Sequence, residues 1–89
     1  MDPSEEAWIE GVERALGVAG GIDEETKRVL LRMTKVTADA TGIRYLAPIT
    51  AYIVGVAAGR SHAAGERFDL RGAAEVIGRL AEGWPTTED

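Results

Sequence analysis

The feature that most constrains this chain is a run of fifteen residues, from Tyr45 to Gly59, that contains no charged side chain. Such a run is typical of a membrane span, of a helix buried in a water-soluble core, or of a binding surface. Pro48 favours a helix that begins near it, and the stretch from Pro48 to Gly59 would then be about 18 Å long at 1.5 Å per residue. A bilayer core requires about 30 Å. The length therefore predicts that the run does not cross a membrane.

A helical wheel divides this run into two faces of different size. The bulky face contains Ile49, Tyr52, Ile53 and Val56, and the opposite face contains the small residues Ala47, Ala51, Gly55 and Ala58. A helix that is apolar on all sides is normally buried on all sides. We therefore expect a third helix over about residues 47–59 at the centre of the fold, with its bulky face in the core. Gly55 is expected to lie against a neighbouring helix.

Helix start and stop signals place three further helices around this run. Asp2, Asp23 and Asp69 each precede an apolar pattern of helical period and are candidate N-caps. The three predicted helices span about residues 3–16, 24–41 and 70–84, and each is amphipathic. Residues 60–68 form a polar loop in this prediction. Trp8 and Trp84 fall on apolar faces, and we expect both to be mostly buried.

The predicted fold class is all-α, a compact four-helix bundle with a buried central third helix. A chain of 89 residues forms one domain at most. The predicted domain covers residues 1–84, and residues 85–89 form a polar C-terminal tail.

The charge balance restricts the partners. The formal net charge is −5, and an acidic domain repels nucleic acid phosphates and anionic lipids. The first residues, "MDPSEEAW", lack the basic and apolar segments of a signal peptide. We therefore expect a cytoplasmic protein that binds neither nucleic acid nor membrane.

Side chains that commonly act in catalysis or bind metal ions are scarce in this sequence. There is no cysteine, and His62 is the only histidine, so a thiol nucleophile and a His/Cys metal site are excluded. The acidic cluster at residues 23–25 is better explained by helix capping than by a calcium loop. The glycines of residues 17–21 match no phosphate-binding motif. We expect no catalytic residue, no metal and no cofactor.

Residues near two of the predicted helices are candidates for a protein interface. A basic ridge lies on the solvent-exposed face of the second predicted helix, with one apolar residue beside it. Two more candidate residues precede the third predicted helix. An alternative interpretation of the ridge is an ordinary solvated helix face. The candidate interface residues are Arg28, Leu31, Arg32, Lys35, Arg44 and Tyr45.

Three segments, "AWIEGVERALGV", "APITAYIVGVAAGR" and "LAEGW", occur in this order. Together they resemble a small actinobacterial all-helical domain of unknown function, over roughly Glu6 to Trp84. Members of that family are found beside, or fused to, molybdenum cofactor guanylyltransferase-like proteins. The family usually has a proline after the arginine that precedes the central helix, and this chain has Tyr45 there. The resemblance implies a connection with molybdopterin-guanine dinucleotide biosynthesis and carries no catalytic residues.

Two functional hypotheses follow. The first is a non-catalytic accessory module that docks on a protein partner, and the resemblance implies that this partner is a molybdenum cofactor guanylyltransferase-like enzyme. The alternative is a structural helical domain that associates with itself, as a homodimer, and has no enzyme partner.

Overall fold

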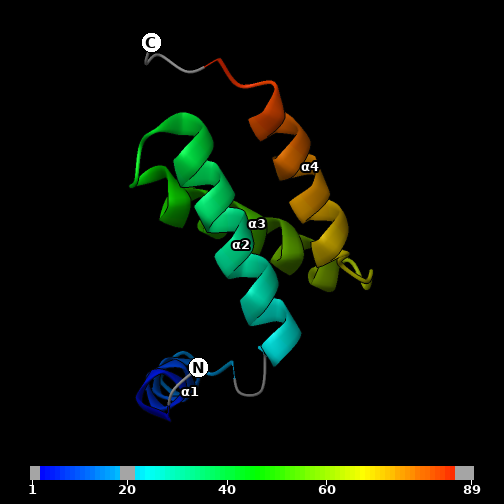
Figure 1. Cartoon of the computed structure of the whole chain (residues 1–89). Helices are drawn as coiled ribbons and strands as arrows, with labels where there is room; N and C mark the ends of the chain where they lie inside the picture. Colours follow the sequence, from blue (N-terminus) through cyan, green and yellow to red (C-terminus); the bar gives the residue numbers. More distant parts are fainter. Residues whose placement is uncertain (1–2, 19–21, 86–89) are drawn as a thin grey trace.

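The computed structural model describes residues 3–18 and 22–85. Within these residues it contains helices and no strand, which confirms the all-α, four-helix prediction (Figure 1). The helices are α1 (Pro3–Ala15), α2 (Glu24–Thr41), α3 (Leu46–Ala63) and α4 (Leu70–Glu82). The predicted N-cap Asp2 and the tail residues 86–89 lie outside the described residues.

Side-chain caps fix where α2 and α4 begin. The Asp23 carboxylate accepts the Thr26 backbone N–H at 2.8 Å, and the Asp69 carboxylate accepts the Gly72 N–H at 3.0 Å. Each bond satisfies one of the N–H groups that the first turn of a helix leaves unpaired. Gly42 ends α2 with a left-handed φ of 72°, a conformation that glycine adopts without a steric penalty. The predicted caps of these two helices are therefore confirmed.

Replacing Asp23 with Ala is expected to lower the melting temperature at neutral pH, because α2 then loses its N-cap. The hydrogen bond from Thr26 holds the pKa of Asp23 below its ordinary value of 3.8. A lowered folded-state pKa stabilises the fold above the ordinary value, and this stabilisation is lost as the pH falls through the lowered pKa. Thermal melts at several pH values should show the difference between wild type and Asp23→Ala shrinking below a pH of about 3.8. Asp23→Asn is the control, since its amide oxygen still accepts a hydrogen bond and does not titrate. A difference that is the same at all pH values would contradict this account.

The third helix is longer than its sequence predicts. It begins at Leu46 and continues to Ala63, so that Arg60 and His62 belong to the helix and not to a loop. The terminating glycine is Gly65, with φ 77°, and its N–H bonds to the His62 carbonyl at 3.0 Å. Gly59 does not end the helix. A glycine makes a helix interior less stable, but its backbone N–H can still donate the helical hydrogen bond.

The second helix, not the third, is the central element, which corrects the prediction of a buried central third helix. α2 packs along both α3 and α4 (Figure 1). The buried residues within the described part of the chain are Met33 and Thr37 of α2 and Val54 of α3. The Thr37 hydroxyl is satisfied inside this core, since it donates to the Met33 carbonyl at 3.0 Å.

The orientation of α3 is the reverse of the predicted one. Val54 is buried and the small residues Ala47, Ala51 and Ala58 are half-buried, so the side with small residues is the covered side. The bulky residues point outward, and Tyr52 is 75% exposed. Gly55 has no neighbouring side chain or helix within 4 Å of where its Cβ would be, so the prediction of close packing at this residue is wrong.

The first helix explains why the bulky face of α3 stays open. In a closed four-helix bundle α1 would lie on that face, but here α1 lies at the N-terminal end of α2 (Figure 1). The Lys27 ammonium joins the two helices through the Glu6 carboxylate at 3.6 Å. Trp8 is 73% exposed and Trp84 is 46% exposed, so the predicted burial of both rings is also wrong.

The dimensions of the molecule agree with this open arrangement. The Cα radius of gyration is 14.4 Å, whereas a compact chain of this length has a radius of about 12 Å. The four helices therefore form a bundle that is more extended than an average domain of this length. None of the described helices combines the length and the apolar character needed to cross a membrane.

Candidate interaction surfaces

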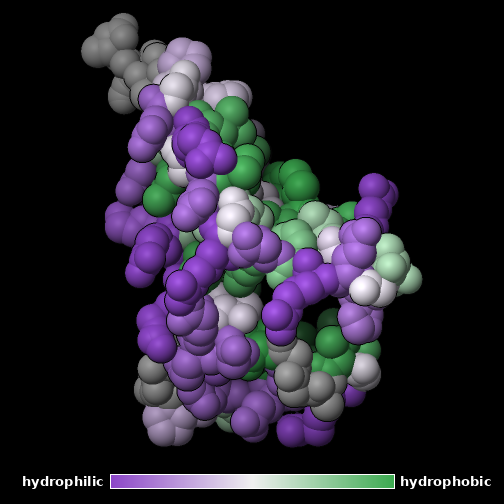
Figure 2. Space-filling view, turned by 90° about the vertical axis from the view of Figure 1, so that its right-hand side faces the viewer, coloured by the Kyte–Doolittle hydropathy of each residue, from purple (hydrophilic) through white to green (hydrophobic). Residues whose placement is uncertain are grey.

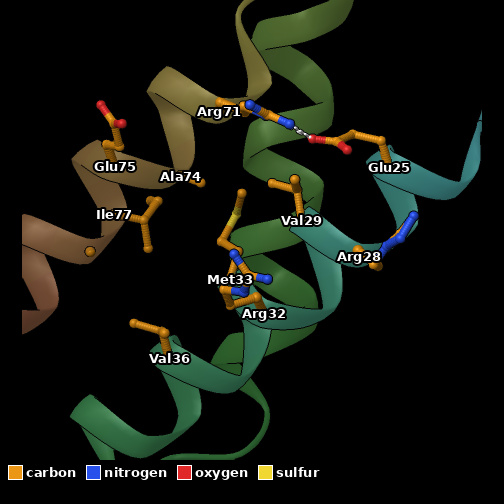
Figure 3. Close-up of a pocket in the computed structure, with 11 residues that line it drawn as sticks. Glu25, Arg28, Val29, Arg32, Met33, Val36, Arg71, Ala74, Glu75 and Ile77 are labelled. Atoms are coloured by element: carbon orange, nitrogen blue, oxygen red, sulfur yellow. Dashed lines mark hydrogen bonds and ion pairs between the residues drawn. The ribbon is translucent and has the colours of Figure 1, made fainter.

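A groove lies between α2 and α4 (Figure 3). Its volume is about 620 Å³. Its apolar lining includes Met33, Val36 and Ile77, and its polar lining includes three arginines. Met33 and Ile77 point toward one another across the groove in Figure 3. The three arginines are Arg28, Arg32 and Arg71.

One of the three arginines is neutralised within the chain. The Arg71 guanidinium of α4 donates to the Glu25 carboxylate of α2, with its Nε at 2.7 Å from the oxygen (Figure 3). This hydrogen bond, together with the charge of Glu25, raises the pKa of Arg71 above its ordinary value. The pair joins the two walls of the groove at one end.

The other two arginines have no such partner. Arg28 and Arg32 are exposed on α2, and neither forms an ion pair with a residue that the structure describes. They lie one helical turn apart and therefore on the same side of α2. The groove consequently presents two positive charges and one further carboxylate, that of Glu75 on α4, beside an apolar lining, on a chain whose net charge is −5.

The structure brings only two of the six predicted interface residues together at this groove. Leu31, which is 59% exposed, lies on another side of α2, near Trp8 and Ile9 of α1. Lys35 is exposed and forms an ion pair with Asp39 at 3.1 Å.

The other two predicted residues lie at the start of α3, and they do not line the groove. Tyr45 is the residue that precedes the first turn of α3, and it is 68% exposed. Arg44, beside it in the chain, is also exposed.

Lys27, at the junction of α1 and α2, is held by two carboxylates. Its ammonium lies 3.4 Å from Glu24 and 3.6 Å from Glu6. Burial opposes the charge of this ammonium, but the two carboxylates outweigh burial and raise the pKa of Lys27. Lys27 therefore positions α1 and is not available to a partner.

A second, apolar groove was not predicted. It lies where α3 and α4 diverge beside α2, and its volume is about 220 Å³. Its walls include Ile49 and Ile53 of α3 and Leu80 of α4, with Trp84 at one end. Figure 2, seen from the α4 side, shows apolar residues gathered in the upper half of the molecule, at the level of the C-terminal end of α4. The sequence did not predict this groove, because the groove depends on the angle between α3 and α4.

The described residues contain no group of three or more His, Cys, Asp or Glu side chains that could hold a metal ion. His62, at the end of α3, is exposed. The linings of the two grooves contain neither histidine nor serine.

Comparison with known families adds one finding. The model of a domain of unknown function, DUF6457, matches residues 2–89. The chain belongs to the DUF6457 family. This agrees with the resemblance to a small domain of unknown function. No curated protein and no solved structure matches the chain.

Proposed function

We propose that this DUF6457 chain is a non-catalytic protein-interaction module that receives an acidic segment of a larger protein in the groove between α2 and α4. The observation that carries this proposal is the pair Arg28 and Arg32, which lack partners among the described residues and stand beside apolar side chains. An arginine guanidinium binds carboxylates with two parallel hydrogen bonds, and the apolar lining accepts the aliphatic part of the same segment.

The charge of the whole chain favours a protein partner over a nucleic acid. A net charge of −5 repels a phosphate backbone, whereas two local arginines attract a short acidic segment. The resemblance described above suggests a partner: a molybdenum cofactor guanylyltransferase-like enzyme of molybdopterin-guanine dinucleotide biosynthesis. The role proposed for the chain is accessory, and the chemistry would belong to the partner.

Reversing both charges should weaken this interaction strongly. We expect the Arg28→Glu/Arg32→Glu variant to bind the guanylyltransferase-like protein of the same organism at least about thirtyfold more weakly than wild type, as measured by isothermal titration calorimetry. The wild-type affinity should also fall as salt is added, since exposed charges are screened.

The matched control reverses two exposed arginines outside the groove. Arg67→Glu/Arg79→Glu changes the net charge by the same amount, so it separates a local effect from a general one. Circular dichroism checks that both variants keep their helix content. Binding that survives the Arg28/Arg32 reversal would contradict the groove as the docking site, and absence of wild-type binding would contradict this partner.

A further inference from the structure

The outward face of α3 is an apolar ridge that the other described helices leave largely exposed. Ile49, Tyr52, Ile53 and Val56 recur at intervals of three and four residues, so they form one continuous stripe. Tyr52 is 75% exposed and Ile53 is 60% exposed. Isolated exposed apolar residues are ordinary, but a continuous stripe of this kind marks a surface that another molecule covers.

A groove of matching chemistry adjoins this ridge. The apolar groove between α3 and α4 shares Ile49 and Ile53 with the ridge, and its opposite wall carries Leu80, which is 57% exposed. The same face of one chain therefore offers both a projection and a hollow. The projection of one copy can fill the hollow of a second copy that is related to it by a two-fold axis. Two-fold symmetric dimers are the commonest soluble homo-oligomers.

The exposed area is large enough for such an interface. The chain exposes 6872 Å², whereas a folded monomer of this mass exposes about 5,000 Å². The excess is about 1,800 Å², and the exposed apolar residues of the α3–α4 face contribute to it. A stable interface buries about 800 Å² on each partner. Half of the excess is therefore sufficient for a dimer.

Charge favours a second copy over a foreign partner at this face. Two copies with a net charge of −5 repel one another, and a contact surface that itself carries no charge adds least to this repulsion. Residues 45–59 contain no charged side chain. A surface specific for a foreign protein normally carries charged groups that select and orient the partner, and this stretch has none.

We infer that two copies of this chain associate through the ridge of α3 and the adjoining groove between α3 and α4. This inference does not rest on the proposed function, because the arginine-lined groove lies between α2 and α4. A dimer of this kind leaves Arg28 and Arg32 free in both copies to receive a partner.

The test is the mass of the whole chain in solution. Sedimentation equilibrium of the wild type should give twice the monomer mass of 9.5 kDa at high protein concentration, and dissociation on dilution. Ile53→Glu should raise the dissociation constant of the dimer at least about thirtyfold, because it buries a charge at the interface. Leu31→Glu is the matched control, since Leu31 is 59% exposed and lies on another face; this variant should remain dimeric.

Three results would overturn the inference: a wild type that is monomeric at every concentration, a dimer that survives Ile53→Glu, or open-ended larger assemblies. If Ile53→Glu does not fold, the inference is tested instead by the melting temperature of the wild type at several protein concentrations. A dimer melts at a higher temperature as its concentration rises, and a melting temperature independent of concentration would overturn the inference.

Discussion

Replacing Val54 with Asp is expected to abolish cooperative folding of this chain. Val54 is the buried residue of α3, at 7% exposed, on the side of the helix that faces α2. Leaving a charge buried without a partner typically costs about 3–5 kcal/mol. A domain of this size has a stability near the lower end of the usual range of about 5–15 kcal/mol. Thermal melts followed by circular dichroism should therefore show no sharp transition for Val54→Asp.

The control for this substitution is Val56→Asp, two residues further along the same helix. Val56 is 37% exposed, on the outward ridge. The new carboxylate stays hydrated there, so Val56→Asp should still melt cooperatively even where it weakens the dimer. If Val56→Asp unfolds the chain and Val54→Asp does not, the assignment of the inner and outer sides of α3 is wrong.

Replacing Met33 with Ala should destabilise the chain by about 2–5 kcal/mol, the usual cost of deleting a large buried side chain. Met33 is 3% exposed and contributes to the core from the central helix. The measurement is urea denaturation at a fixed protein concentration, so that any dimer contributes equally to both proteins. Leu31→Ala, on the exposed side of the same helix, should change the free energy of unfolding by less than about 0.5 kcal/mol. Equal effects of the two substitutions would show that α2 is not the central helix.

The sequence predicted the helices well because their signals are local. Asp23 and Asp69 cap the helices they were expected to cap, and α2 ends at Thr41 as predicted. Each signal depends on residues within one or two turns. The end of α3 was missed because the polar residues 60–68 were expected to form a loop, whereas the helix continues to Ala63 and Gly65 supplies the left-handed residue after it.

The arrangement of the helices could not be read in the same way. Periodicity shows which residues share a face, but it does not show which neighbour covers that face. The two sides of α3 were correctly separated, yet the small side is covered and the bulky side is exposed. That outcome depends on the position of α1, which the Glu6–Lys27 ion pair connects to the start of α2. Trp8 is exposed for the same reason.

The candidate site was predicted in part. Arg28 and Arg32 were recognised as a basic ridge, because both lie on the wet face of one helix. Arg71, the Glu25 carboxylate that pairs with it, and the groove between α2 and α4 were missed, since they follow from contact between helices far apart in the sequence. Leu31 and Lys35 were grouped with the ridge but lie outside the groove.

The bulky face of α3 points outward, where, by the inference above, a second copy of the chain covers it. Oxidative footprinting of Tyr52 at high and low protein concentration tests this inference most directly, since this ring is 75% exposed in the single chain. Tyr52 should be protected at high concentration and become reactive when the dimer dissociates on dilution. Protection that does not change with concentration would show that the chain covers this face itself, and constant reactivity would show that nothing covers it; either result would contradict the inference.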